Sequence, residues 1–470
     1  MTTSSATPGP SCRHGGGRPA TAILDELARR GTELLRTDDP CLYRALEAES
    51  LRQQRTLVLV ASSSVADPSV LACQSSMLVN VTAEGYPGRR YHAGCEHVDT
   101  VEELAIDRAK ALFRAAYANV QPHSASVANE MVLSALMRPG DPLLGMELHQ
   151  GGHLTHGAAP SLSGQYFHSY GYGVTPAGLI DFDQVSKLAG EIHPKIIICG
   201  ATAYPRTIDF AAFRQIADQV GALLVADISH IAGLVAAGLH PSPIDHAHIT
   251  TTCTHKQLFG PRGALILMGR DADAPAPDGR QTLAKAMQRS VFPFFQGAPA
   301  VNVIAAKARA LDRCSSAEFI DLARRIVADA KVLAAALAGR GYHIVAGGTD
   351  NHMVLIDLTE QGLSGKVAEL ALESCGIIVN KNYVPRDQRP STVTSGLRLG
   401  TNTMAARGAG PEEMRICAAL IDRVLRAVRP LDEWQYDLAP AVRAAIQADV
   451  VELCRHLPLP RHPFAPEQAL

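Results

Sequence analysis

The 470-residue sequence has no excess of charge of either sign, because 44 basic side chains balance 46 acidic ones and the formal net charge is −2. A protein that binds nucleic acid mainly through bulk charge needs a basic excess to neutralise phosphates. Aromatic residues make up only 5% of the chain and there is one tryptophan, which argues against a stacking platform for single-stranded nucleic acid. The composition therefore predicts no nucleic-acid partner.

Long apolar runs are also missing, since no stretch approaches the roughly 20 residues of a membrane span. The first twenty residues lack the apolar core of a secretory signal. Their glycine and proline content predicts a disordered tail over 1–20, although two arginines without acidic residues also fit a transit peptide. We therefore expect a protein with no membrane partner.

Disulfide signatures are absent as well, because the ten cysteines form no CxxC pair and no dense cluster. In a chain of this length such scattered cysteines favour reduced thiols and a cytoplasmic location. The cysteines are Cys12, Cys41, Cys73, Cys95, Cys199, Cys253, Cys314, Cys375, Cys417 and Cys454.

Short apolar runs bounded by Gly, Pro or Asp predict buried strands, and several of them alternate with helical segments. One such helix covers 209–221, with Asp209 as its N-cap and Gly221 at its end. A capping box at 100–103 predicts that another helix begins at Thr100. Strands that are apolar on both faces indicate a largely parallel sheet covered on two sides. The predicted strands are 142–146, 195–199, 223–226, 249–253 and 264–268.

After a surface loop at 270–280, a helical segment at 317–340 introduces a different alternation of strands and helices. We predict an N-terminal arm and a large domain over 21–325, and a smaller α/β domain over 326–470. A chain of this length favours more than one domain.

Three histidines at 149, 153 and 156 raise the possibility of a zinc site. Histidines four residues apart share a face only on a helix, and Gly151-Gly152 is a poor helix interior. No carboxylate stands where a HExxH motif needs one. We expect a loop that presents one histidine to a ligand, and no metal.

Three further features each have an ordinary interpretation and a functional one. Ser124 precedes a helix, where it is an N-cap or part of a phosphate site. Lys256 follows an apolar run, where it is a surface ion-pair partner or a Schiff-base amine. Asp227 ends a strand, where it caps the next helix or holds a protonated ring nitrogen. In this chain order the three are the parts of a pyridoxal-phosphate enzyme.

The wider sequence resembles the serine hydroxymethyltransferase family from about residue 22 to the VVELCRHLPLP segment. This resemblance implies a fold type I, aspartate-aminotransferase-like α/β architecture. It has a mainly parallel seven-stranded sheet in the large domain and a smaller C-terminal α/β domain. The motifs that carry it are AEGYPGRRY, NVQPHS, GGHLTHG, AYPR, HIAGLVAAGLHPSP, THK with GPRG, GGTDNH, VNKN and TSGLRLGT.

The resemblance implies a role for each residue that matches a family motif. It makes Lys256 the Schiff-base lysine, Asp227 the partner of the pyridine nitrogen and His153 the residue stacked on the ring. It assigns the substrate carboxylate to Arg398, and protons of the substrate hydroxyl or of folate to Glu84. Further cofactor contacts fall to Ser124, Ala125, Thr202, His230 and His255, with Gly297 or Ala298 reaching in from a neighbouring subunit; substrate contacts to Ser62, Thr82 and His92; and folate contacts to Tyr91, Leu148 and Asn382.

The departures from the family pattern concern mainly the acceptor pocket. Thr82 and His92 stand where the family has tyrosines that reach a partner subunit, and the folate-side SPF segment is replaced at 390–392. A smaller residue at 82 leaves room for an extra methyl on the acceptor, and this pattern resembles the α-methylserine hydroxymethyltransferase branch. A well-packed pocket rejects one methyl by roughly 1–3 kcal/mol.

From this we expect a homodimer or homotetramer with shared active sites that uses pyridoxal 5'-phosphate and tetrahydrofolate. The expected reaction is reversible transfer of a hydroxymethyl group from methylenetetrahydrofolate to D-alanine, giving α-methyl-L-serine. Ordinary serine/glycine interconversion and a folate-independent aldolase or transaldolase are the alternatives. A non-enzymatic member of the family is a further one, against which intact Lys256 and Arg398 count.

Overall fold

The computed structural model describes residues 20–460 and 462–464. It contains two compact units. One holds α1 (Ala20–Asp38) and most of α2 (Pro40–Arg55), and the other runs from Gln53 to Pro460. The predicted disordered tail over 1–20 lies outside the described residues, apart from Ala20, where α1 begins. Within the described part of the chain, every helix is too short or too polar to cross a bilayer.

A seven-stranded sheet forms the centre of the larger unit, with strand order β4-β10-β9-β8-β7-β5-β6. The neighbours from β9 through β6 are parallel, whereas β10 runs antiparallel to both β9 and β4. This confirms the predicted mainly parallel sheet. Its strands are β4 (Tyr117–Asn119), β5 (Pro142–Met146), β6 (His168–Tyr172), β7 (Ile196–Cys199), β8 (Leu223–Asp227), β9 (Ile249–Cys253) and β10 (Ala264–Met268).

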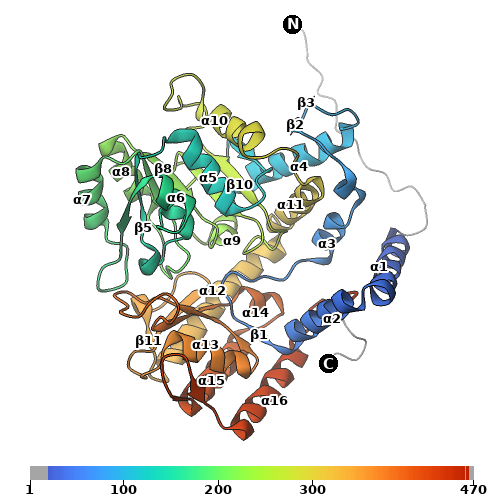
Figure 1. Cartoon of the computed structure of the whole chain (residues 1–470), viewed down its shortest axis with the longest axis vertical. Helices are drawn as coiled ribbons and strands as arrows, with labels where there is room; N and C mark the ends of the chain where they lie inside the picture. The colour runs from blue at the N-terminus through green and yellow to red at the C-terminus, as the bar shows by residue number, and fades with distance from the viewer. Residues whose placement is uncertain (1–19, 461, 465–470) are drawn as a thin grey trace. The chain divides into compact units, whose positions relative to one another are not determined.

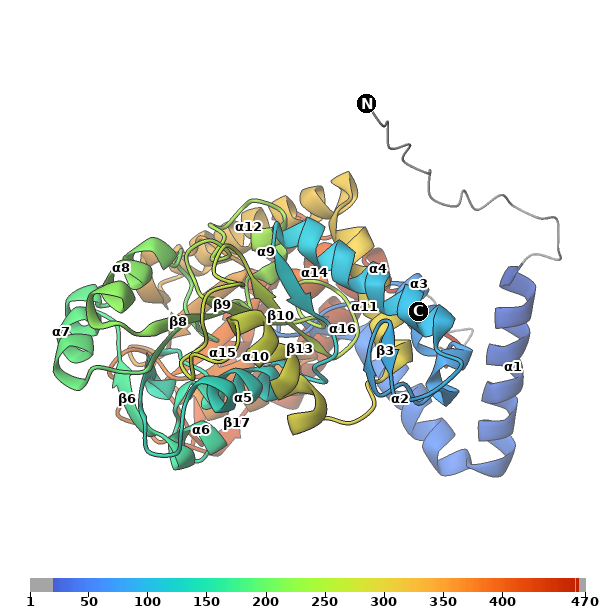
Figure 2. The same ribbon diagram turned by 90° about the horizontal axis from the view of Figure 1, so that it is seen from above.

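Both faces of this sheet are buried because successive apolar side chains along each strand point to opposite sides. Leu144 belongs to one core cluster and its neighbour Leu143 to another, and Ile197 and Ile196 divide in the same way. Figures 1 and 2 show the surrounding helices. Helices α4 (Glu96–Phe113), α7 (Phe182–Ile192), α8 (Phe210–Val220), α9 (Ala232–Ala236) and α11 (Val301–Cys314) pack on the first cluster, and α5 (Ala125–Leu136) and α10 (Leu283–Arg289) on the second.

Of the predicted helix starts, the one at Thr100 is wrong. Helix α8 begins after Asp209, whose side chain accepts the Ala212 N–H, and ends at Gly221 in the left-handed region. Helix α4 begins instead at Glu96, so Thr100 lies inside it and its hydroxyl donates to the Glu96 carbonyl. A threonine that bonds back to the preceding turn is compatible with a helix interior, and the capping-box spacing alone does not exclude it.

The C-terminal part is a smaller α/β assembly around a four-stranded antiparallel sheet of order β11-β12-β15-β14. Its first strand, β11, is short, because a 3-10 turn begins at Val345. The boundary at 326 stays a prediction. The elements are α12 (Ala317–Ala338), β11 (His343–Ile344), β12 (Met353–Asp357), α13 (Gly365–Ser374), β14 (Asn380–Asn382), β15 (Gly396–Gly400), α14 (Asn402–Ala406), α15 (Pro411–Ala427) and α16 (Pro440–His456).

Short elements complete the larger unit. Strand β1 (Leu57–Val58) pairs with β13 (Ile377–Ile378), and so joins the segment after α2 to the C-terminal part. Strands β2 (Gly85–Tyr86) and β3 (Arg89–Arg90) form a hairpin. The others are α3 (Pro68–Gln74), α6 (Leu162–Tyr166), β16 (Arg429–Pro430) and β17 (Tyr436–Asp437).

Candidate active site

A cavity of about 430 Å³ lies at the carboxyl ends of the parallel strands. Ligands of open α/β sheets bind at this edge, because the loops that follow the strands converge there. Asp227 ends β8, Lys256 follows β9, and Ser124 lies between β4 and α5. Eleven predicted site residues line the cavity: Ser62, Ser124, Ala125, His153, Thr202, Asp227, His230, His255, Lys256, Asn382 and Arg398.

Asp227 is a buried carboxylate whose oxygens are held by three donors. Oδ2 accepts from Asn129 Nδ2 at 2.8 Å and lies 3.2 Å from His156 Nε2, while Oδ1 accepts the Ser229 N–H at 2.9 Å. Burial raises the pKa of Asp227, but the hydrogen bond and charge of His156 outweigh it and hold that pKa well below its ordinary value. The site therefore presents a fixed negative charge at the strand end.

The same network holds His153. Asn129 Nδ2 also donates to Thr155 Oγ1 at 2.9 Å, and Thr155 Oγ1 lies 2.8 Å from His153 Nδ1. On its other side Asn129 Oδ1 accepts from Thr251 Oγ1 at 2.6 Å. Burial lowers the pKa of His153 to about 4, so its ring is neutral near pH 7 and is fixed relative to Asp227.

Sequence reasoning missed Asn129, Thr155 and His156 as site residues. His156 stands in the quoted GGHLTHG motif, and Asn129 lies one helical turn after Ala125, on the first turns of α5. These two positions, next to predicted site residues, were the sequence signal that could have identified His156 and Asn129. The predicted loop contains two 3-10 turns, and it brings two histidines, His153 and His156, to the cavity where one was expected. The ring of His149 contacts Tyr383 instead.

Ser124 is an N-cap, as one of its two interpretations predicts, and its role in a phosphate site stays a prediction. It is the N-cap of α5, where its Oγ accepts the Val127 N–H, and it also lines the cavity with Ala125. The start of α5 therefore presents backbone N–H groups and a hydroxyl, which suit an anion. Arg262, another lining residue that sequence reasoning missed although it lies in the GPRG motif, adds positive charge.

Lys256 and Arg398 also line the cavity, together with His230 and His255, whose pKa values are lowered by burial. Burial lowers the pKa of Lys256, against the opposing charges of Cys253 and Asp227. Arg398, on β15, donates from Nε to Asn380 Oδ1 at 3.1 Å and from a terminal nitrogen to the Thr202 carbonyl at 2.6 Å. Burial lowers the pKa of Arg398 to about 10. No carboxylate among the described residues pairs with it, so it is a partly buried cation without a counter-ion.

The other predicted site residues lie elsewhere in the single chain. Glu84, Tyr91 and Gly297 line a second cavity of about 510 Å³ together with the 292–296 segment. A Cβ on Gly297 would stand 3.0 Å from Glu84 Oε1, so glycine keeps that approach open. Thr82, His92, Leu148 and Ala298 line neither cavity; His92 Nδ1 accepts the Glu84 N–H at 3.4 Å.

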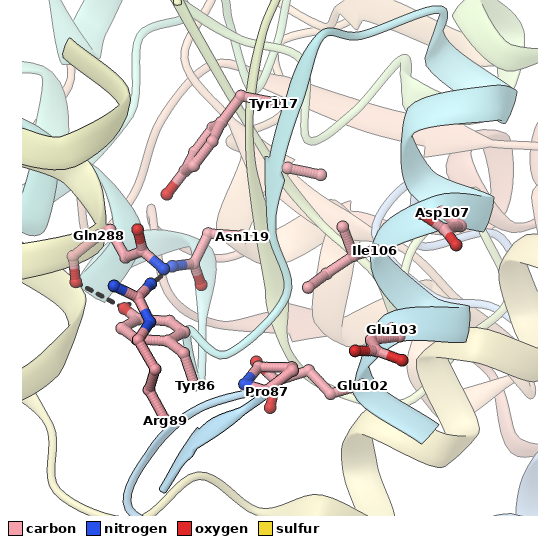
Figure 3. A pocket seen from close by; sticks show the side chains of 11 residues that line it. Tyr86, Pro87, Arg89, Glu102, Glu103, Ile106, Asp107, Tyr117, Asn119 and Gln288 are labelled. Carbon is pink, nitrogen blue, oxygen red and sulfur yellow. Dashed lines mark hydrogen bonds between the residues drawn. The ribbon is translucent and has the colours of Figure 1, made fainter. Parts of the chain in front are cut away.

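The β2–β3 hairpin follows Glu84, and buried polar contacts hold it to the rest of the larger unit. Arg90 pairs with Asp99 at 2.8 Å and with Glu102 at 2.6 Å. Figure 3 shows the Tyr86 hydroxyl, which donates to the Gln288 carbonyl and accepts from Asn119, at a third cavity of about 370 Å³. These contacts fix where the hairpin presents Glu84.

The residues around the Lys256 cavity fit pyridoxal phosphate. They offer a carboxylate for a ring nitrogen, an imidazole face, an amine, and an anion site at the start of α5. Two buried ring nitrogens, His230 Nδ1 and His255 Nδ1, have no hydrogen-bond partner in the described residues. Such orphaned polar atoms are rare in protein interiors unless a ligand or water satisfies them.

Comparison with known proteins finds a match between residues 35–421 and the family model "Serine hydroxymethyltransferase". A serine hydroxymethyltransferase of Marinomonas sp. (strain MWYL1) is 48% identical over 431 residues, covering 92% of this chain and 98% of that protein. One of Chromohalobacter salexigens is 47% identical over 423 residues, covering 90% of this chain and 97% of that protein.

Proposed function

Because the chain belongs to the serine hydroxymethyltransferase family of pyridoxal-phosphate-dependent one-carbon transferases, we propose that it transfers a hydroxymethyl group reversibly between serine and glycine, with tetrahydrofolate as co-substrate. The observation that carries this proposal is the convergence of Lys256, Asp227 and an unpaired Arg398 on one cavity. An amino-acid carboxylate supplies the anion that Arg398 lacks, in a bidentate geometry that lysine cannot reproduce.

Each side chain then has a chemical task. The cofactor, when bound, acts as an electron sink for the substrate Cα. Asp227, held anionic by its donors, keeps the cofactor's ring nitrogen protonated, and the neutral His153 covers the ring. The lowered pKa of Lys256 leaves more of its amine unprotonated and nucleophilic at neutral pH. Ser124 and Arg262 hold the phosphate, and Glu84 moves a proton on the substrate hydroxyl or on folate.

The active site is proposed to be shared between two subunits of a homodimer or homotetramer. Glu84, Tyr91 and Gly297 lie around a cavity other than that of Lys256, which supports their action on a neighbouring subunit's site. Tyr91 and Phe294, which line this second cavity, are 77% and 70% exposed. Such exposure is unusual for large apolar side chains, and a subunit interface would cover them.

Leu148 and Asn382 are proposed to line the folate path. A cytoplasmic location is also proposed, supported by nine free cysteines among the described residues.

Transfer to D-alanine, giving α-methyl-L-serine, is the second candidate, and Thr82 is the observation that favours it. Thr82 is exposed and does not line the Lys256 cavity of its own chain, so it acts on the acceptor only from a partner subunit. There a threonine in place of the family's tyrosine leaves space for one methyl.

The decisive experiment offers glycine, D-alanine and L-alanine separately to the purified protein, with and without methylenetetrahydrofolate, and identifies the products. We expect L-serine from glycine only when the folate is present. Preferential formation of α-methyl-L-serine from D-alanine would replace serine/glycine transfer by the second candidate. Turnover that needs no folate and uses a free aldehyde would instead establish an aldolase.

Thr82→Tyr tests the acceptor pocket. If Thr82 admits the methyl, this substitution lowers the ratio of kcat/KM for D-alanine over that for glycine about tenfold to a hundredfold, because one methyl clash costs roughly 1–3 kcal/mol. The ratio is measured at saturating cofactor so that lost cofactor affinity does not enter it. An unchanged ratio would remove the basis of the D-alanine candidate.

A further inference from the structure

Lys307 is a buried lysine that none of the roles described above uses. It lies on α11 and is 1% exposed. Its Nζ donates to three backbone carbonyls, those of Val120 at 2.6 Å, Pro122 at 3.0 Å and Ala264 at 3.1 Å. An ammonium has three donors, so all of them are satisfied without a carboxylate partner.

The three carbonyls belong to the two segments that form the anion end of the Lys256 cavity. Val120 and Pro122 lie in the turn between β4 and Ser124, and Ala264 begins β10, two residues after Arg262. The segments are also joined directly, because the Ala264 N–H donates to the Pro122 carbonyl at 3.0 Å. Lys307 therefore fastens the Ser124 turn to the segment that carries Arg262.

Gly263 makes room for this lysine. A Cβ at residue 263 would stand 2.2 Å from Lys307 Cε and 2.8 Å from Nζ. The φ of Gly263 is outside the left-handed region, so this glycine is required by the close approach of the lysine rather than by its backbone conformation.

The positive charge of Lys307 reaches the Ser124 turn. Burial lowers the pKa of His123, the residue before Ser124, and the charge of Lys307 lowers it further. Burial also lowers the pKa of Lys307 itself to about 7, against the attraction of Glu102. A buried charge is screened much less than a surface one, so the protonated form of Lys307 and an anion at the start of α5 stabilise each other.

We propose that Lys307 is a positioning residue for the phosphate of the cofactor, which holds the Ser124 turn against the Arg262 segment and makes the site select phosphorylated over unphosphorylated pyridoxal. The inference rests on the proposed phosphate site at Ser124. If Lys307 only stabilised the fold through its hydrogen bonds, its loss would change the affinities for pyridoxal phosphate and for pyridoxal equally.

The test compares dissociation constants of pyridoxal phosphate and of pyridoxal for the cofactor-free protein, by equilibrium dialysis, in the wild type and in Lys307→Met. We expect affinity for pyridoxal phosphate to fall about tenfold to a hundredfold, the range of a charged interaction in a buried site, and affinity for pyridoxal to change about threefold or less. Lys331→Met, an exposed lysine on α12, is the matched control and should behave as the wild type.

If Lys307→Met does not fold, Gly263→Ala probes the same contact with the lysine retained, since the added methyl displaces Nζ. It should produce the same selective loss for pyridoxal phosphate. Equal losses for both ligands, or no loss, would overturn the role of Lys307. A wild-type protein that binds neither ligand would instead contradict the proposed function, so the two failures are distinguishable.

Discussion

At the scale of single residues, the lysine, arginine and aspartate side chains of the Lys256 cavity do not form ion pairs with each other, which leaves their charges available to ligands. Asp227 is stabilised as an anion by neutral and histidine donors, and Arg398 donates to a carbonyl and an amide. Leaving a buried charge without a counter-ion costs several kcal/mol. Such a cost persists where function requires it, and in the proposed function a substrate carboxylate offsets it.

Lys256→Ala tests the covalent attachment of the cofactor. We expect the variant to bind pyridoxal phosphate through the remaining lining residues, but borohydride treatment should no longer fix it to the protein, because the only proposed amine at the strand end is gone. Mass spectrometry of the reduced protein measures this directly, with the wild type as the positive control. Continued fixation at full stoichiometry would assign the attachment to another residue.

Site residues that lie in sequence motifs could be predicted, whereas the residues that hold them in place through hydrogen bonds could not. Lys256, Asp227 and Ser124 follow strands in recognisable contexts, and the structure brings them to one cavity. Asn129 reads as an ordinary helix residue, and its role comes from Asp227 and Thr251 on neighbouring strands, 98 and 122 residues away in the sequence. Hydrogen bonds across such separations depend on the tertiary fold, which local patterns do not contain.

At the scale of elements, the β2–β3 hairpin is held to α4 by the Arg90–Glu102 pair, in which both side chains are almost wholly buried. Arg90→Met should lower the free energy of unfolding by about 3–5 kcal/mol, since it leaves the Glu102 carboxylate buried without its cation. Because the hairpin presents Glu84 and not Lys256, kcat should fall more than affinity for pyridoxal phosphate. Urea unfolding, steady-state kinetics and cofactor titration measure the three quantities.

Arg89→Met is the control, because Arg89 is the exposed neighbour on the same strand. It should leave stability and kcat within about 0.5 kcal/mol of the wild type, as for most surface substitutions. A parallel loss of cofactor affinity in Arg90→Met would show that the hairpin and the Lys256 cavity are not independent.

Strands were predicted more accurately than helix starts, for a physical reason. The runs at 142–146, 249–253 and 264–268 match β5, β9 and β10 residue for residue. β5 and β10 are apolar because both of their faces are buried, whereas β9 carries three buried threonines, whose β-branched side chains also favour a strand. Helix α4 extends four residues before the predicted start at Thr100. Its first turn contains polar residues that suit either a loop or an exposed helix, and the packing of the following residues decides between the two.

At the scale of the whole molecule, the proposal of shared active sites predicts complementation between two inactive variants. Lys256→Ala and Glu84→Gln proteins, unfolded and refolded together, should form hybrid dimers with one intact and one doubly altered site. In an equal mixture this restores about a quarter of the wild-type activity, since half of the dimers are hybrids with one working site. Each variant refolded alone is the control, and the absence of recovery in confirmed hybrids would place both residues in the site of one chain.

The contact between Arg398 on β15 and the Thr202 carbonyl after β7 has a consequence for which amines the protein accepts. A neutral carbonyl orients the guanidinium without cancelling its charge, so a decarboxylated analogue such as a simple amine or an amino alcohol leaves that charge uncompensated. Removing the partner of a fully buried ion costs about 3–5 kcal/mol, and Arg398 is partly buried, so such analogues bind at most about a hundred-fold to a few-thousand-fold less well. In the proposed function, this contact therefore lets the charge of one side chain exclude amines that lack a carboxylate.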